Sequence, residues 1–152
     1  MNQIAGLLPV ANILLELDVA NKKRVFEQVG LLFENNHGIS RNVVYDSLLA
    51  REKLGSTGLG QGIAIPHGRI KTLPEALGAF VRTCTAIPFD SPDGRGVSQI
   101  FVLLVPEQAT DQHLQILSEL AQMFSDKALR ERIATAPDAQ SLHQIFARWQ
   151  ST

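Results

Sequence analysis

The sequence contains little that would mark a disulfide-bonded, membrane or nucleic-acid-binding protein. Cysteine occurs once among 152 residues, at Cys84, which excludes an internal disulfide and a cysteine-based zinc site. The longest apolar runs reach only about half the length of a membrane-spanning helix, and segment 1–4 lacks the basic start of a secretory signal. The 14 lysines and arginines nearly balance the 15 aspartates and glutamates, so no overall positive charge attracts nucleic acid. We therefore expect a cytoplasmic protein with no nucleic-acid partner and no membrane insertion.

Length and hydrophobic periodicity favour a single domain over residues 1–152 that mixes helices and strands. A chain of this length can bury a core without metals or disulfides, and no linker signal divides it. Strands are predicted at 13–17, 77–87 and 98–105, the last two as an antiparallel hairpin with a long loop. Helices are predicted from about 21 to 38 and at about 40–54, 110–125, 126–135 and 138–150. Since helices precede and follow the strands, we expect a mixed sheet covered on both faces.

The central part of the sequence is rich in glycine. Five of the eleven glycines lie within residues 55–68, which predicts a tightly shaped loop whose backbone N–H groups could surround a phosphate. The common nucleotide fingerprints do not fit. Ile63 follows Gly62 where a P-loop needs lysine, and the same Ile63 replaces the third glycine of the dinucleotide pattern. Ser56 also lacks the Gly-x-Ser-x-Gly context of a serine hydrolase.

His67 is the chemically reactive residue of this segment. It stands between Pro66, which restricts the backbone before it, and Gly68, which permits a tight passage after it. The neutral imidazole is populated at physiological pH and offers an unprotonated nitrogen, as a phosphoryl relay requires. The hydroxyl and guanidinium groups nearest in sequence belong to Arg51, Ser56, Thr57 and Arg69. From these residues alone, a structural or metal-binding histidine remains an alternative.

A family resemblance adds to this interpretation. Residues 51–68, Arg-Glu-Lys-Leu-Gly-Ser-Thr-Gly-Leu-Gly-Gln-Gly-Ile-Ala-Ile-Pro-His-Gly, closely resemble the active-site segment of the type-2 enzyme IIA family of the bacterial phosphotransferase system. Within that family the match resembles the nitrogen-regulatory branch (IIA-Ntr) more than the mannitol or fructose proteins. It extends over nearly the whole chain and includes Asp111-Gln-His113-Leu. One departure is Gln61, where asparagine is common in the family.

The resemblance implies both a fold and a reaction. The fold would be α+β, a three-layer α/β/α sandwich with a mixed sheet and the reactive histidine at its edge. The reaction would transfer a phosphoryl group to His67 from the phosphohistidine of a small HPr-like phosphocarrier protein (NPr), without a cofactor or a metal. Sugar-transporting relatives pass the group on to a IIB domain. Because this chain has no room for a IIB or IIC domain, we expect the regulatory branch, whose members bind a transporter, a sensor kinase or another enzyme according to their phosphorylation state.

The resemblance also assigns roles to the residues around His67, each with a simpler alternative. Arg51 would neutralise phosphoryl oxygens, or would only lay its stem along the core. Ser56 and Thr57 would lie near the phosphoryl group, or would only cap the loop backbone. Arg69, at a position where the family varies between lysine and arginine, would take part in the site or would serve partner docking only.

His113 is expected to be a second active-site histidine, beside His67 in space. Thr110 or Asp111 can cap the helix that follows, which places His113 in the first turn, where the helix dipole favours an anion. Sequence spacing alone favours a core-edge histidine bonded to a backbone carbonyl. The resemblance favours a histidine that stabilises the transferring phosphoryl group.

The remaining candidate side chains are expected to be structural. His37 lies at a predicted helix terminus, and His143 flanks the apolar face of the last helix, so we expect structural or solvent-facing roles. Cys84 lies in an apolar run and is expected to be a half-buried strand residue rather than a nucleophile.

Overall fold

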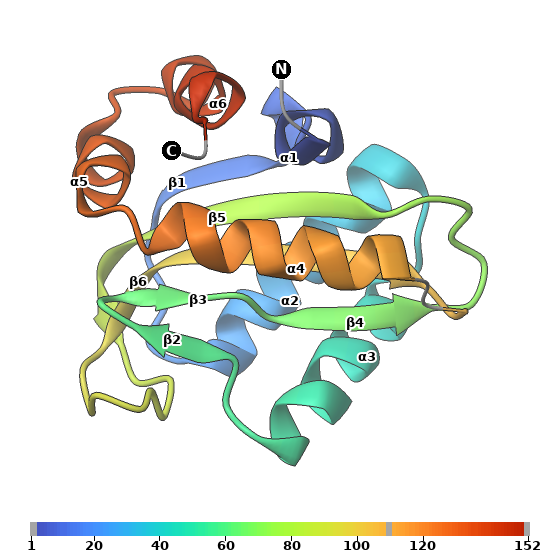
Figure 1. Cartoon of the computed structure of the whole chain (residues 1–152). Coiled ribbons are helices and arrows are strands. Elements are labelled where there is room, and N and C mark those ends of the chain that lie inside the picture. The colour runs from blue at the N-terminus through green and yellow to red at the C-terminus, as the bar shows by residue number, and fades with distance from the viewer. Residues whose placement is uncertain (1–2, 109–110, 151–152) are drawn as a thin grey trace.

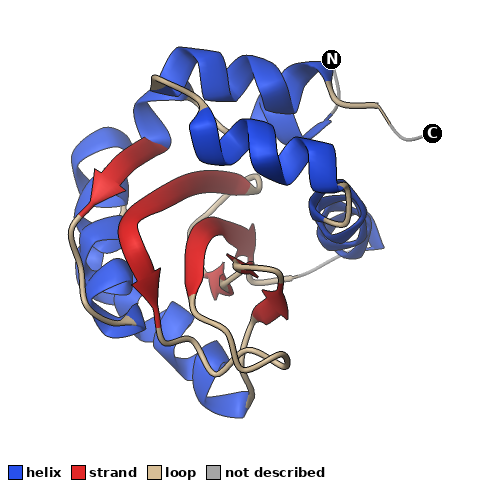
Figure 2. Cartoon of the chain, turned by 90° about the vertical axis from the view of Figure 1, so that its left-hand side faces the viewer, coloured by secondary structure: helices blue, strands red, loops and turns tan. Residues whose placement is uncertain are grey.

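The structure, a computed structural model that describes residues 3–108 and 111–150, has three layers (Figure 1). A mixed six-stranded sheet lies in the middle, and helices cover both of its faces (Figure 2). The helices are α1 (Gln3–Leu7), α2 (Lys22–His37), α3 (Arg41–Leu54), α4 (Asp111–Phe124), α5 (Lys127–Thr135) and α6 (Ala139–Arg148), with a short 3-10 helix at Val10–Asn12. The strands are β1 (Ile13–Leu17), β2 (Gly58–Gly60), β3 (Ile63–Ala64), β4 (His67–Ile70), β5 (Leu77–Ile87) and β6 (Val97–Pro106). The expected α+β sandwich with a mixed sheet is confirmed.

Strand β6 organises the sheet, whose order is β1-β5-β6-β3-β2. It pairs antiparallel with β5 on one side. On its other side it pairs in parallel with β3 through residues 99–100 and with β4 through residues 103–106. β3 and β4 thus lie one after the other along the same side of β6, separated by residues 65–66, and β2 pairs with the other side of β3. The Pro66 carbonyl accepts a hydrogen bond from Leu103 N at 2.9 Å across the interruption. Proline cannot donate to a ladder, so an interruption at this position costs the sheet little.

Two apolar clusters hold the layers together, one on each face of the sheet. On one face, α2 and α3 pack on β4, β5 and β6 through side chains such as Phe26, Phe33, Val44 and Leu48. On the other face, α1, α4, α5 and α6 pack on the sheet around Phe101, Phe124 and Phe146. The rings of Phe101, Phe124 and Phe146 meet edge to face at centroid distances of 5.8–6.5 Å, a favourable arrangement for aromatic pairs. Burial of these large side chains supplies the main driving force for folding.

The predicted helices and strands agree with the structure in position and type. The 13–17 strand, the 77–87 and 98–105 hairpin and the five predicted helices are present, with ends that differ by a few residues. Residue 110, one of the two predicted caps of α4, lies outside the described residues. The sequence analysis missed α1 and the 3-10 helix, and it treated β2, β3 and β4 as a loop. In the part of the chain that the structure describes, no helix combines the length and the apolarity needed to cross a membrane.

The expectation for Cys84 is wrong. Cys84 is exposed rather than half-buried, because the β5–β6 register is irregular beyond Arg82, and its thiol donates to the Glu16 carbonyl at 3.0 Å. Ser40 stands at the N-cap of α3 but makes no side-chain capping bond. The Glu34 carboxylate accepts the Arg41 N–H instead, at 3.0 Å.

His37 and His143 make structural contacts, as expected. The His37 ring nitrogen Nε2 lies 3.0 Å from Asn12 Oδ1, and that of His143 lies 3.2 Å from the Ala5 carbonyl. Each contact joins segments far apart in the sequence, so both histidines help to fix the packing of the N-terminal segment.

The β2–β3 hairpin suggests that Gln61→Asn will stabilise the protein. Gln61 and Gly62 have φ values of 59° and 79°, and a tight turn with positive φ at both central residues favours Asn-Gly. Asparagine adopts this region at a lower cost than glutamine, so we expect the free energy of unfolding to rise by about 0.5 kcal/mol. Urea denaturation measures the change. Gln61→Ala is the control and should give no gain, whereas an equal gain with alanine would contradict a conformational cause.

Candidate functional site

His67 lies at the start of β4, immediately after the interruption between β3 and β4. Gly68 follows it and is buried against α3. A Cβ atom at Gly68 would collide with the Ser47 side chain and would lie 3.2 Å from the Ser47 carbonyl carbon. The Ser47 hydroxyl also donates to the Arg69 carbonyl at 3.0 Å. Glycine therefore permits the close approach of α3 to β4 that brings Arg51 to His67.

The two ring nitrogens of His67 have different partners. Nδ1 lies 3.0 Å from the Ile65 carbonyl oxygen, and Nε2 lies 3.3 Å from Arg51 Nε. A carbonyl only accepts and a guanidinium only donates. The proton therefore resides on Nδ1, and Nε2 keeps an unprotonated lone pair that faces the Arg51 N–H.

The surroundings of the half-buried His67 keep its ring neutral. Burial lowers the pKa of His67 below its ordinary value of 6.5. The hydrogen bond to the Ile65 carbonyl and the charge of Glu52 oppose this change, while the positive charge of Arg51 adds to it. The lowering prevails, so the imidazole is mostly neutral at pH 7 and Nε2 is available as a nucleophile.

Arg51 reaches His67 from the last turn of α3. It is half-buried, and besides its contact with His67 it donates from Nη1 to the Gly55 carbonyl at 2.8 Å. Helix α3 lies on the face of the sheet opposite to α4. Because β4 is at the edge of the sheet, Arg51 can still reach the His67 ring. The structure thus brings together two of the residues singled out from the sequence.

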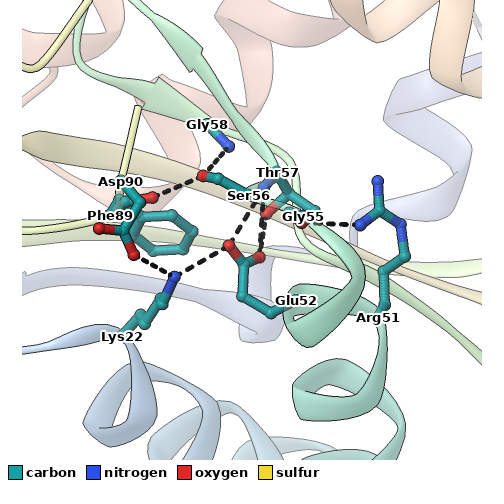
Figure 3. A network of polar contacts seen from close by, with 9 residues as sticks. All are labelled: Lys22, Arg51, Glu52, Gly55, Ser56, Thr57, Gly58, Phe89 and Asp90. Carbon is teal, nitrogen blue, oxygen red and sulfur yellow. Dashed lines mark hydrogen bonds and ion pairs between the residues drawn. The ribbon is translucent and has the colours of Figure 1, made fainter. Parts of the chain in front are cut away.

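Ser56 and Thr57 bond to neighbouring protein groups (Figure 3). The Thr57 hydroxyl is buried and donates to Glu52 Oε1 at 2.6 Å. The Ser56 hydroxyl donates to the Phe89 carbonyl at 2.5 Å and accepts the Gly58 N–H at 3.0 Å. The Ser56 hydroxyl therefore bonds backbone groups, whereas the Thr57 hydroxyl bonds the Glu52 side chain, and both hold the shape of the glycine-rich segment.

Glu52 is a buried carboxylate that the sequence analysis missed. It accepts hydrogen bonds from Thr57 and pairs with Lys22 Nζ at 3.1 Å, and Lys22 also pairs with Asp90 at 3.0 Å. A signal was present, because Glu52 follows Val44 and the buried Leu48 at four-residue spacing on the inner face of α3. Among residues 3–108 and 111–150, no group of three or more histidine, cysteine, aspartate or glutamate side chains could hold a metal ion.

Strand register places His67, Arg69 and α4 on one side of the sheet. His67 pairs with Leu103, and Arg69 pairs with Val105. Directly paired residues project to the same face, and these two partners belong to the cluster that α4 covers. His113 is half-buried in the first turn of α4, and Arg69 is exposed.

Comparisons with known proteins agree with this architecture. The family model described as "Phosphoenolpyruvate-dependent sugar phosphotransferase system, EIIA 2" matches residues 7–149. The "Nitrogen regulatory protein" of Pseudomonas aeruginosa is 38% identical over 95% of both chains. The "PTS system fructose-specific EIIA component" of Haloferax volcanii is 31% identical, over 97% of this chain and 96% of its own.

A solved structure shows a similar fold at higher sequence identity. The crystal structure of nitrogen regulatory protein IIA-Ntr from Neisseria meningitidis is 51% identical to this chain and superposes with a TM-score of 0.90. The match covers 95% of this chain and 99% of the other. The chain therefore belongs to the type-2 EIIA family of the phosphoenolpyruvate-dependent phosphotransferase system, in its nitrogen-regulatory (IIA-Ntr) branch.

Proposed function

We propose that the protein is a cytoplasmic phosphohistidine carrier of the nitrogen-type phosphotransferase system and that the acceptor atom is Nε2 of His67. The donor would be an HPr-like phosphocarrier (NPr). The observation that supports this proposal is the pair of contacts on the ring: the Ile65 carbonyl occupies the protonated nitrogen, and Arg51 faces the unprotonated one. A phosphoryl group on Nε2 would therefore form beside a guanidinium, which suits phosphoryl oxygens in charge and shape.

The transfer step needs only groups that the site contains and the phosphorylated donor. The Nε2 lone pair attacks the phosphorus of the donor phosphohistidine. A new N–P bond forms while the donor's N–P bond breaks, and the bonding pair returns to the donor's imidazole nitrogen. Nδ1 keeps its proton against the Ile65 carbonyl, which stabilises the positive charge that the ring gains. Catalysis is then mainly positioning and electrostatic stabilisation, as in other phosphoryl transfers.

The other predicted site residues take supporting roles in this proposal. His113 would donate a hydrogen bond to the phosphoryl group, an idea supported by its place in the first turn of a helix on the same side of the sheet as His67. Arg69 is exposed two residues from the acceptor, which suits contact with a partner protein. Ser56 and Thr57 would act indirectly, by holding the shape of the segment beside the phosphoryl group.

Regulation would follow from the charge of the phosphoryl group. A phosphorylated His67 carries a phosphoryl group with close to two negative charges, partly offset by the positive charge of the ring, and this group changes the affinity of the site for any complementary surface. A transporter, a sensor kinase or another enzyme could read this change. Comparing the binding of unmodified and phosphorylated protein to isolated partners tests the idea, and equal affinities for every partner would leave only a binding module that does not depend on phosphorylation.

A sugar-specific IIA is the second candidate function, favoured by the likeness to the Haloferax volcanii protein named as fructose-specific. Such a protein would pass its phosphoryl group to a IIB partner. Adding fructose- and mannitol-type IIB domains to the labelled protein and following the label separates the two candidates, because a regulatory IIA should keep the phosphoryl group.

We expect His67→Ala to abolish phosphorylation and to leave the fold intact, because the half-buried ring contributes little to the core. The protein is incubated with the general phosphotransferase enzyme, its phosphocarrier and labelled phosphoenolpyruvate. The wild type should carry an acid-labile, base-stable label. His143→Gln, which changes a histidine with a structural contact, is the control and should be labelled normally. Labelling of His67→Ala would place the phosphorylated residue elsewhere.

The lowered pKa of His67 predicts how the rate of phosphoryl transfer depends on pH. Since this pKa is lowered, the neutral form should dominate above about pH 6.5, and the transfer rate should fall as pH drops through the lowered value. Because the pKa of His67 is lower in the folded state than in the unfolded state, the free energy of unfolding is higher above about pH 6.5. It falls as the pH drops and the ring is protonated. Arg51→Met removes a nearby positive charge and should raise the pKa. NMR titration of the ring nitrogens measures it, with the exposed Arg24→Met as a control that should change nothing.

His113→Ala should slow phosphoryl transfer by about 10²-fold while His67 still accepts some label, because one stabilising donor is lost and the nucleophile is kept. Rapid-quench measurement of label on His67 gives the rate. His37→Gln is the matched control and should retain the wild-type rate. Unchanged kinetics in His113→Ala would exclude a role in the reaction.

A further inference from the structure

Glu52 carries the most deeply buried charge in the neighbourhood of His67. Its side chain is 2% exposed, yet it is surrounded by donors: Thr57 N at 3.1 Å, the Thr57 hydroxyl at 2.6 Å and Lys22 Nζ at 3.1 Å. A buried carboxylate is costly unless it is paired and hydrogen-bonded. Several donors are therefore placed around this one buried carboxylate, although an apolar side chain would fill the same space at a lower cost. This arrangement indicates that the carboxylate does more than fill space.

The location of Glu52 suggests that reason. Glu52 follows Arg51 in the last turn of α3, and the chain leaves the helix at Leu54. Two ties then close residues 51–57 into a compact unit, one from Glu52 to Thr57 and one from Arg51 Nη1 to the Gly55 carbonyl (Figure 3). Because Arg51 Nη1 is held by Gly55, its Nε is directed at His67 Nε2.

Lys22 completes the arrangement from the first turn of α2. Burial alone would lower the pKa of its ammonium, but the hydrogen bonds to Asp90 and Glu52 outweigh burial and raise it above 10.5. Lys22 therefore stays charged and neutralises Glu52. Without it, an unpaired carboxylate one residue from Arg51 would repel an incoming phosphoryl group and compete for the guanidinium. Its second partner, the Asp90 side chain, is 81% exposed, so Lys22 joins the buried charge to the surface.

We propose that Glu52, neutralised by Lys22, is a positioning residue that holds the 51–57 segment so that Arg51 faces His67 Nε2. This inference rests on the proposed phosphoryl transfer to His67. Glu52 itself touches neither the ring nor, by its burial, the donor protein. The charge of Glu52 also acts against the lowering of the His67 pKa, so the rates of the variants are compared well above pH 6.5, where the ring is neutral in each of them. The effect that remains there passes through Arg51, and misplacing such a group by about 1 Å can cost about 10²-fold in rate.

The test compares single substitutions that remove one contact each. Glu52→Gln keeps the size of the side chain and removes its charge. Thr57→Val removes the hydroxyl, and Thr57→Ser keeps it as the conservative rescue. Asp46→Asn neutralises an exposed carboxylate of the same helix and serves as the control. Thermal unfolding followed by circular dichroism sets a temperature at which every variant is folded.

We expect Glu52→Gln to lower the maximal rate of phosphoryl transfer by about 10- to 100-fold with little change in KM for the phosphorylated donor, because Arg51 acts on the reacting atoms. Thr57→Val should show a smaller loss, and Thr57→Ser and Asp46→Asn should match the wild type. If Glu52 only supported the fold, Glu52→Gln would lower the stability of the protein without lowering the maximal rate at an unchanged KM. Loss confined to KM, or rates unchanged in both Glu52→Gln and Thr57→Val, would overturn the proposal.

A double-mutant cycle identifies the path of the effect. In an Arg51→Met background, Glu52→Gln should reduce the rate little further, because the group that it positions is already gone. An equal reduction in both backgrounds would refute action through Arg51. If Glu52→Gln fails to fold, Thr57→Val takes its place in the cycle.

A second readout does not depend on phosphorylation. The ¹⁵N chemical shift of His67 Nε2 reports the Arg51 hydrogen bond in the unphosphorylated protein, and it should move in Glu52→Gln toward its value in Arg51→Met. An unchanged shift would overturn the proposal. A wild-type protein that takes no label would refute the proposed function, and the Nε2 shift would still decide whether Glu52 places Arg51.

Discussion

The pairing of β6 with two short strands that are separated by residues 65–66 is the constraint on which the site depends. β6 is continuous and buried, and it pairs with β3 and then β4 along one side. Between these two pieces the ladder is kept by the Pro66 carbonyl, which accepts from Leu103 N. Interrupting the strand frees the Ile65 carbonyl to meet the His67 ring two residues later. The interruption thus supplies both the position of the imidazole and the acceptor that fixes its proton.

The electrostatics of the site follow from partial burial. A fully exposed histidine would titrate near its ordinary pKa, and a fully buried one could not receive a protein donor. The half-buried ring of His67 takes a lowered pKa while remaining reachable. Arg51 favours the neutral ring, and Glu52 opposes this from a greater depth, where Lys22 offsets its charge. The neutral histidine therefore results from several opposing contributions rather than from one contact.

Much of the fold could be predicted from the sequence, because long amphipathic helices and apolar strands repeat their patterns over many residues. The small strands could not. β2, β3 and β4 span three, two and four residues, too few for a period to show, and they form because β6 offers them a partner. His67 could be predicted from its glycine-rich context and a family resemblance. The burial of Glu52 is indicated by its four-residue spacing from Val44 and Leu48, but its pairing with Lys22, on another helix, follows from no spacing rule.

The hydrogen bond between His67 Nδ1 and the Ile65 carbonyl has a consequence for the direction of the phosphoryl transfer that we propose. An acceptor nitrogen that is already unprotonated needs no general base to begin the reaction, and a ring proton that stays in place needs no acid to end it. Arrival and departure of the phosphoryl group can then use the same arrangement in reverse, by microscopic reversibility. Because the proposed transfer exchanges an N–P bond on one imidazole for an N–P bond on another, its free-energy change is small, and the concentrations of the partners set the balance between phosphorylated and unphosphorylated forms. The phosphorylated fraction of such a protein would follow the phosphorylated fraction of its donor.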